Sequence, residues 1–370
     1  MLNAPPITTG QALAVLQQGW QAQRSGQLRA SWMLHGRPGI GKTEIIQTLA
    51  ADIGAKLYDL RLTTIEPQDL RGLPFFDMER QRTVWFRPED LPDDPTRPSI
   101  LFLDELTAAA PHLQPTVYGL LQERRVGAHL LPESCMVIAA GNMVEDGAVA
   151  YEMGTALSDR LIHLHLTASA DDWLTGYALP HGLDPAVIAF IRTRPDCLDT
   201  TETALRDGEM IACTPRSWAR VSMLLQALPD RATRNIAIAG VLGEAIAAEF
   251  RLVMDDIAAT VQVDALLDAP PRGRSPLYPR ALHGMTALAY ALVMRANSEN
   301  LGQIIDIMAE IRKLGEELGA PFSAMPLAEL GTHGFELLIA RALEQGWQDA
   351  FLTSAAYADY AREREAAGLA

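Results

Sequence analysis

Residues 36–43 read Gly-Arg-Pro-Gly-Ile-Gly-Lys-Thr, and this octapeptide constrains the fold more than any other stretch of the chain. It matches the phosphate-binding loop pattern G-x-x-x-x-G-K-[ST] at every fixed position. Glycines in such a loop let backbone N–H groups approach phosphate oxygens where a Cβ would clash. The pattern therefore predicts a strand, a loop and a helix that together bind a nucleoside triphosphate.

The sequence on both sides of the loop supports this prediction. Residues 31–35 are mostly apolar, which is typical of a short buried strand, and apolar residues recur at helical spacing after the loop. We expect a helix from Lys42 to about Ile53, with its positive dipole end toward the phosphates. Three of the 31 basic residues are lysines, so Lys42 stands out in a chain that otherwise uses arginine.

Composition limits the class of protein. A chain of 370 residues is long enough for two or three domains. The formal net charge of −15 argues against a nucleic-acid-binding protein, so we expect no nucleic-acid partner. The three cysteines show no metal or redox spacing, and their odd number predicts a reducing cytoplasm. The N-terminus does not resemble a signal peptide and the apolar stretches are short or interrupted, so we expect no membrane association.

The pattern along the chain changes near residue 168. Residues 31–166 alternate strand-like and helix-like segments, which predicts an α/β fold with a parallel sheet and strands at 32–35, 56–62, 100–104, 135–140 and 161–166. Later residues have a helical pattern, interrupted by a segment rich in proline, glycine and arginine that we expect to be a linker or a surface loop. The predicted divisions are a helical lead-in at 1–30, an α/β nucleotide-binding core at 31–167, a helical region at 168–267, a Pro-rich linker at 268–280 and a helical C-terminal region at 281–370.

A second motif follows the predicted strand at 100–104. Four apolar residues precede Asp104 and Glu105, and ligands bind at the carboxyl edge of a parallel sheet. Asp104 is placed to hold Mg²⁺, directly or through water. Glu105 is the candidate general base for water that attacks the γ-phosphate. The alternative is a strand end with solvated acids, which the upstream phosphate loop makes less favourable.

Two polar residues near other strands are weaker candidates. Asn142 follows the apolar strand 136–140 and would orient the attacking water or contact the γ-phosphate; alternatively it is a turn residue. Arg160 precedes the alternating strand 161–166 and would reach the γ-phosphate of a neighbouring subunit. Its alternative is a surface arginine paired with Asp159.

Arg216 belongs to a helix start. Thr214 is a favourable N-cap and Pro215 a favourable first helical residue, which places Arg216 in the first turn. The helix dipole disfavours a cation there, and a nearby phosphate would remove the conflict. The alternative is a solvated arginine.

These elements, in this order and spacing, resemble AAA+ ATPases, and most closely the MoxR-like branch. The resemblance covers roughly residues 30–225 and is carried by the stretches at 69–88, 103–127, 139–160 and 214–221. It implies catalytic or sensor roles for Glu105, Asn142, Arg160 and Arg216, and Mg²⁺ ligation by Thr43 and Asp104. The residues it implies at the nucleotide are Gly36, Arg37, Pro38, Gly39, Ile40, Gly41, Lys42, Thr43, Glu44 and Asp104.

The resemblance also implies a function. Its members hydrolyse ATP, usually as hexameric rings with ATP between subunits, and commonly act beside partners with a von Willebrand factor A domain. It implies that 168–267 is an α-helical lid, that the segment from Phe75 to Phe86 is a β-hairpin insertion, and that the chain remodels or activates a partner protein. Thr107 departs from the family pattern, because relatives often have asparagine there. Two alternatives stay open: a nucleotide-gated scaffold with little turnover, and a nucleic-acid-remodelling ATPase.

Overall fold

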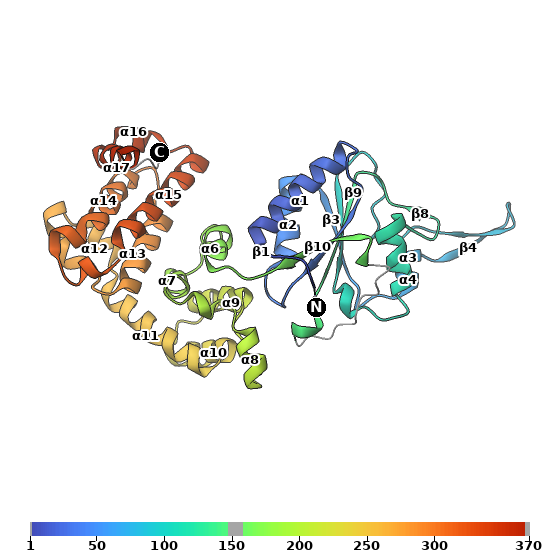
Figure 1. Cartoon of the computed structure of the whole chain (residues 1–370), viewed down its shortest axis with the longest axis horizontal. Coiled ribbons are helices and arrows are strands. Elements are labelled where there is room, and N and C mark those ends of the chain that lie inside the picture. Colours follow the sequence, from blue (N-terminus) through green and yellow to red (C-terminus); the bar gives the residue numbers. More distant parts are fainter. Residues whose placement is uncertain (1, 147–157, 367–370) are drawn as a thin grey trace. The chain divides into compact units, whose positions relative to one another are not determined.

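The chain forms two compact units. The computed structural model describes residues 2–146 and 158–366 (Figure 1). One unit comprises Met1–Trp173 with Asp199–Ser217, and the other Leu174–Leu198 with Trp218–Ala370. The finer division expected from the sequence remains a prediction.

A parallel sheet forms the centre of the first unit. Its strand order is β1-β10-β2-β9-β6-β3, and every neighbouring pair is parallel. The predicted α/β class with a parallel sheet is confirmed, and the five predicted strands lie within one residue of their expected bounds. The strands are β1 (Pro6–Ile7), β2 (Ser31–His35), β3 (Lys56–Arg61), β6 (Ser99–Asp104), β9 (Cys135–Gly141) and β10 (Leu161–Leu166).

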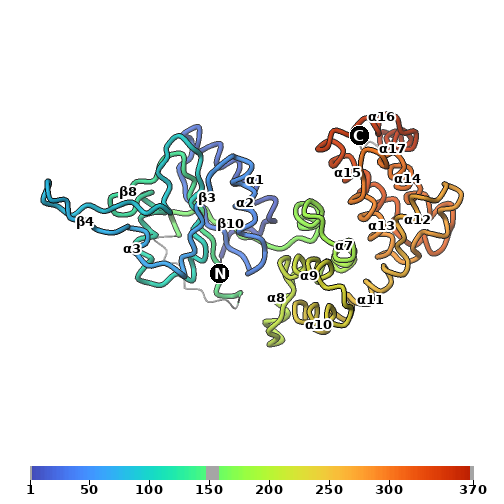
Figure 2. Tube along the Cα trace, turned by 180° about the vertical axis from the view of Figure 1, so that it is seen from behind, coloured from blue at the N-terminus to red at the C-terminus, as the bar shows by residue number. Residues whose placement is uncertain are grey.

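Helices cover both faces of this sheet, as Figures 1 and 2 show. One face packs against α1 and α2 through a core that includes Leu16, Ile46 and Phe102. The other face packs against α3 and α4 through a core that includes Leu70 and Val117. Because both faces are covered, β6 and β9 are buried at every position, which explains their uninterrupted apolar sequences. The helices that lie wholly in this unit are α1 (Thr9–Arg24), α2 (Lys42–Asp52), α3 (Pro67–Arg71), α4 (Gln114–Tyr118), α6 (Ala170–Trp173) and α8 (Thr201–Asp207).

The register of the sheet places three sequence motifs side by side. His35 at the end of β2 pairs with Gly141 at the end of β9, and Leu103 near the end of β6 pairs with Ala139. The loops that follow β2, β9 and β6 therefore leave the sheet from one edge, where parallel α/β sheets bind ligands.

Two antiparallel hairpins extend the first unit. They are β4 (Pro74–Asp77) with β5 (Arg82–Trp85), and β7 (Arg125–Val126) with β8 (His129–Leu130). The β4–β5 hairpin projects away from the sheet in both views (Figures 1 and 2). It carries exposed large apolar side chains, including Phe76 and Met78, which is 78% exposed.

The second unit is helical. Apolar residues at helical spacing along α14 are buried there, among them Ile304 and Met308. The segment 268–280 is anchored to α14: buried Arg274 pairs with Glu310 at 2.6 Å, and Tyr278 donates a hydrogen bond to the same carboxylate at 2.6 Å. Its helices are α7 (Pro185–Thr193), α10 (Arg231–Leu242), α11 (Glu244–Thr260), α12 (Val263–Asp268), α13 (Leu282–Arg295), α14 (Leu301–Leu318), α15 (Leu327–Gln345), α16 (Asp349–Thr353) and α17 (Ala355–Ala366), while α9 (Pro215–Ala227) begins in the first unit.

Two further observations concern the whole described chain. None of its described helices is both long enough and apolar enough to cross a bilayer. All three cysteines, Cys135, Cys197 and Cys213, are buried free thiols.

Candidate nucleotide-binding site

The phosphate loop joins β2 to α2, and two of its glycines have backbone conformations that favour glycine. Gly39 has a φ of +81° and Gly41 a φ of +106°. A Cβ on Gly39 would also lie 2.8 Å from the hydroxyl of Thr214. Gly41 is the N-cap of α2, so N–H groups of the first helical turn face the loop. This arrangement suits an anion.

Lys42 is the cation of this loop. Its ammonium donates hydrogen bonds to Asn142 Oδ1 at 2.8 Å and to the carbonyl of Arg37 at 3.1 Å, and another to the carbonyl of Gly36. Burial lowers the pKa of Lys42 to about 8, although the Asp104 carboxylate opposes this shift. A partly desolvated ammonium attracts a phosphate more strongly than a solvated one.

The two acids after β6 have different environments. Asp104 is 9% exposed, and its Oδ1 accepts a hydrogen bond from the backbone N–H of Glu105 at 2.9 Å. Glu105 has a φ of 59°, an uncommon conformation for a residue other than glycine, and the chain turns there into the 3-10 turn Leu106–Ala108. Its carboxylate accepts a hydrogen bond from the Thr63 hydroxyl and lies 3.8 Å from Arg61 Nε. Arg61 and Thr63, near the end of β3, were not singled out from the sequence.

Asn142 follows β9 beside Lys42, and its backbone position depends on close packing. A Cβ on Gly141 would lie 2.5 Å from Thr107 Oγ1 and 3.0 Å from Met33 Cε. Thr107, which is 8% exposed, therefore packs directly against the residue that precedes Asn142.

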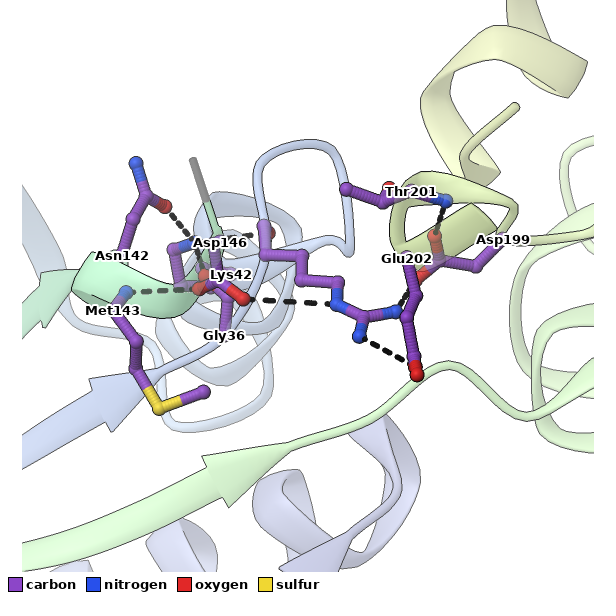
Figure 3. A network of polar contacts seen from close by, with 9 residues as sticks. Gly36, Lys42, Asn142, Met143, Asp146, Asp199, Thr201 and Glu202 are labelled. Atoms are coloured by element: carbon purple, nitrogen blue, oxygen red, sulfur yellow. Dashed lines mark hydrogen bonds and ion pairs between the residues drawn. The ribbon is translucent and has the colours of Figure 1, made fainter. Parts of the chain in front are cut away.

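Arg37 connects the loop to two other segments through Asp146, Asp199 and Glu202, the three acidic residues labelled in Figure 3. Its guanidinium lies 3.2 Å from Glu202, 3.5 Å from Asp199 and 3.6 Å from Asp146. Burial disfavours the charge of Arg37, but these carboxylates together raise its pKa above the ordinary value. Asp146 in turn accepts a hydrogen bond from the backbone N–H of Met143 at 2.8 Å. The guanidinium thus contacts three carboxylates, and these ion pairs link the phosphate loop to the segment after β9 and to α8.

The structure places the two remaining arginines at opposite edges of the sheet. The backbone N–H of Arg216 donates to Gly39 O at 3.3 Å, which brings the first turn of α9 to the phosphate loop. Arg160 is an exposed residue just before β10, where Leu161 pairs with Ser31 at the start of β2. The loop lies beyond the other end of β2, roughly 16 Å along the strand at about 3.3 Å per residue. The structure therefore does not bring Arg160 to the loop of its own chain.

The other predicted nucleotide contacts surround this centre. Thr43 and Glu44 occupy the first turn of α2, Pro38 is exposed in the loop and Ile40 is buried in the core. Thr43 and Asp104 offer hydroxyl and carboxylate oxygens, the donor types that Mg²⁺ prefers. Residues 147–157, which belong to the stretch 139–160 that carries the resemblance, lie outside the described part of the chain.

Known proteins resemble parts of this chain. The family model described as "ATPase family associated with various cellular activities (AAA)" matches residues 31–163. The ATPase family gene 2 protein homolog B of Bos taurus is 33% identical over 105 residues, a match that covers 28% of this chain and 11% of that protein. Its Mus musculus counterpart is also 33% identical over 105 residues, covering 28% and 12%. The matched region is thus a small part of these relatives.

Solved structures resemble the chain more distantly. A RuvB mutant of Thermotoga maritima is 13% identical, covering 71% of this chain and 77% of that chain with a TM-score of 0.40. A putative ATPase from Cytophaga hutchinsonii is 15% identical, covering 78% and 76% with a TM-score of 0.34. Likenesses of this extent carry no conclusion about function. The family match over residues 31–163 spans less than half of the chain, and it shows that this part is similar to AAA-family ATPases.

Proposed function

We propose that the chain is a Mg²⁺-dependent AAA+ ATPase of MoxR type that works as a ring oligomer and remodels or activates a partner protein. One observation carries this proposal: Lys42, Asn142 and the Asp104–Glu105 pair meet at one edge of the sheet, while Arg160 lies at the opposite edge. The first three form most of a hydrolytic site. Arg160 can act in such a site only if it comes from a second subunit.

The proposed reaction is attack of water on the γ-phosphate of ATP. Backbone N–H groups of the loop and the Lys42 ammonium bind the phosphates, and Arg216 adds positive charge beside the loop. Glu105 accepts the proton of the attacking water, and Asn142 orients that water. A bound Mg²⁺, held by Thr43 and Asp104, would neutralise phosphate charge. The Arg160 guanidinium of a neighbouring subunit stabilises the charge of the transition state.

The assembly and its client are also proposals. A shared active site needs at least two subunits, and a head-to-tail contact repeated from subunit to subunit gives a ring when the rotation closes. We propose such a ring, and the resemblance implies a hexamer. The exposed apolar side chains of the β4–β5 hairpin, including Phe76 and Met78, support contact with a protein client. A partner with a von Willebrand factor A domain and a cytoplasmic location complete the proposal; both rest on sequence reasoning.

The first test is steady-state ATP hydrolysis per subunit as protein concentration rises. A shared site predicts a specific rate that climbs and then saturates as subunits associate. A constant, appreciable rate in protein shown by sizing to be monomeric would contradict the shared site. No hydrolysis at any concentration, with tight ATP binding, would favour the scaffold alternative.

The contacts of Glu105 are compatible with the scaffold alternative. The Glu105 carboxylate accepts a hydrogen bond from Thr63 and lies near Arg61, and both contacts hold its side chain toward the end of β3. A chain that never releases it would bind ATP with little turnover, or would turn over only with its partner present.

Substitution of the candidate base provides a second test. Glu105→Gln keeps the size and polarity of the side chain but cannot accept the proton, so turnover should fall by at least ~100-fold. ATP affinity should change little, because the loop and Lys42 remain. Single-turnover hydrolysis and equilibrium ATP binding measure the two effects, and an unchanged turnover would exclude Glu105 as the base.

A further inference from the structure

Two histidine rings connect the strand that carries the phosphate loop to β10. His35 is the last residue of β2, directly before Gly36, and is 6% exposed. Its Nε2 lies 2.8 Å from Nδ1 of His163 in the neighbouring strand, and the two rings stack with centroids 5.0 Å apart. Residues 161–166 were expected only to form a strand, so the sequence did not indicate this pair.

A second hydrogen bond fixes the orientation of the pair. His163 Nε2 lies 2.9 Å from the carbonyl oxygen of Ser158 and 3.1 Å from its hydroxyl. Because a carbonyl oxygen only accepts, His163 Nε2 carries a hydrogen. In the tautomer with its hydrogen on Nε2, His163 has a lone pair at Nδ1, and His35 Nε2 donates to it. Burial, with His163 and His165 nearby, lowers the pKa of His35 to about 4, so His35 is neutral at neutral pH and supplies this one N–H.

The chain of hydrogen bonds ends next to the candidate arginine. Ser158 is two residues before Arg160, which is exposed at the edge of the sheet. We propose that His163, held by His35, is a positioning residue that fixes the backbone before Arg160 and so directs its guanidinium toward the γ-phosphate of the neighbouring subunit. This inference rests on the proposed function, because it assigns His163 a role in the shared site.

Substitution of His163 should affect hydrolysis at the site of the neighbouring subunit and leave ATP binding by the phosphate loop of its own subunit nearly unchanged. His163→Leu removes both hydrogen bonds, and turnover should fall by about tenfold or more while the KM for ATP changes less than about twofold. His163→Gln should stay within about threefold of the unchanged protein, because one amide can accept from His35 and donate to Ser158. His165→Leu is the control, since it removes another histidine near His35 on the same face of β10 but leaves both hydrogen bonds of His163 in place, so its turnover should stay close to that of the unchanged protein.

A mixing experiment tests the direction of the effect. In a ring that contains His163→Leu and Glu105→Gln subunits, the first keeps its own phosphate loop and its base Glu105, and the second keeps a correctly held Arg160. The mixture should therefore hydrolyse ATP faster than the sum of the two separate proteins. An Arg160→Ala and Glu105→Gln mixture is the reference, and it should be activated in the same way.

Each outcome has one meaning. If the reference mixture is activated and the His163→Leu mixture is not, His163 acts on its own site and the inference is overturned. If the reference mixture is not activated, or Arg160→Ala alone has full activity, the shared site of the proposed function fails and the inference falls with it. If His163→Leu does not fold, as judged by circular dichroism, His163→Asn replaces it, since its shorter amide can still pair with His35 but loses the reach to Ser158.

Discussion

Lys42 shows how one residue of the site depends on its surroundings. Its ammonium is surrounded by two loop carbonyls and the Asn142 amide oxygen, and burial lowers its pKa to about 8. The ammonium form binds phosphate, and bound phosphate raises the pKa again because it stabilises the charge. Below the pKa of Lys42 in the free protein, the side chain is already charged, so the affinity for ATP does not depend on its ionisation. Above it, affinity falls because the free protein must first take up a proton.

The affinity of the protein for ATP should therefore depend on pH through Lys42. The Kd for ATP should change little near pH 7, roughly double at about pH 8 and then rise by up to about tenfold per pH unit, since above pH 8 the phosphates stay ionised while Lys42 loses its proton. Lys42→Arg should bind more weakly, but with a flat profile, because arginine keeps its charge. Isothermal calorimetry in buffers of matched ionic strength measures both. A flat profile for the unchanged protein would show either that Lys42 does not contact the phosphates or that its pKa is not lowered, and a Lys42→Ala variant with unchanged affinity would establish the first.

At the scale of elements, the site depends on how closely β9 packs against the turn after β6. A Cβ on Gly141 would lie 2.5 Å from Thr107 Oγ1, closer than real contacts allow. Gly141→Ala should therefore lower the free energy of unfolding by about 1–3 kcal/mol and displace the neighbouring Asn142. Thr107→Ala removes both nearest Thr107 atoms, so the double variant should recover most of the loss.

The double-mutant cycle is measured by denaturant unfolding together with ATP turnover. Thr107→Ala alone is the control, because it removes the hydroxyl without crowding β9. If the loss from Gly141→Ala is the same in both backgrounds, the steric argument is wrong and Thr107 does not determine the path of the chain before Asn142.

The sequence predicted the elements better than the contacts between them. Strand bounds and the start of α2 follow from local apolar patterns and from the loop motif, which each segment carries in its own residues. The pairing of Arg37 with Asp199, and of Glu105 with Thr63, depends on which strands and helices become neighbours in the folded unit. No periodicity within a segment encodes that choice. The hydrogen bond between His35 and His163 was unpredictable for the same reason.

At the scale of the whole molecule, one chain is an incomplete catalyst under the proposed function. Arg160 and the phosphate loop lie at opposite edges of one sheet, so a rigid subunit cannot supply both to one nucleotide. Successive subunits in a ring can, because each then offers one edge to the next. The proposed activity is therefore a property of the assembly, which is why subunit concentration and mixing are the informative variables.

The net charge of the whole molecule favours a protein client over a nucleic-acid client. The formal net charge is −15, whereas duplex DNA carries one negative charge per about 1.7 Å and is held mainly through cations that displace its counterions. We therefore expect ATP hydrolysis to change less than about twofold when duplex or single-stranded DNA is added at about 50 mM salt, where electrostatic binding is strongest. The measurement is a steady-state rate at saturating ATP, with heparin as a control for nonspecific polyanion effects. Stimulation by DNA that heparin does not reproduce, and that declines steeply with added salt, would show a local basic surface strong enough to overcome the net charge. The client would then be a nucleic acid.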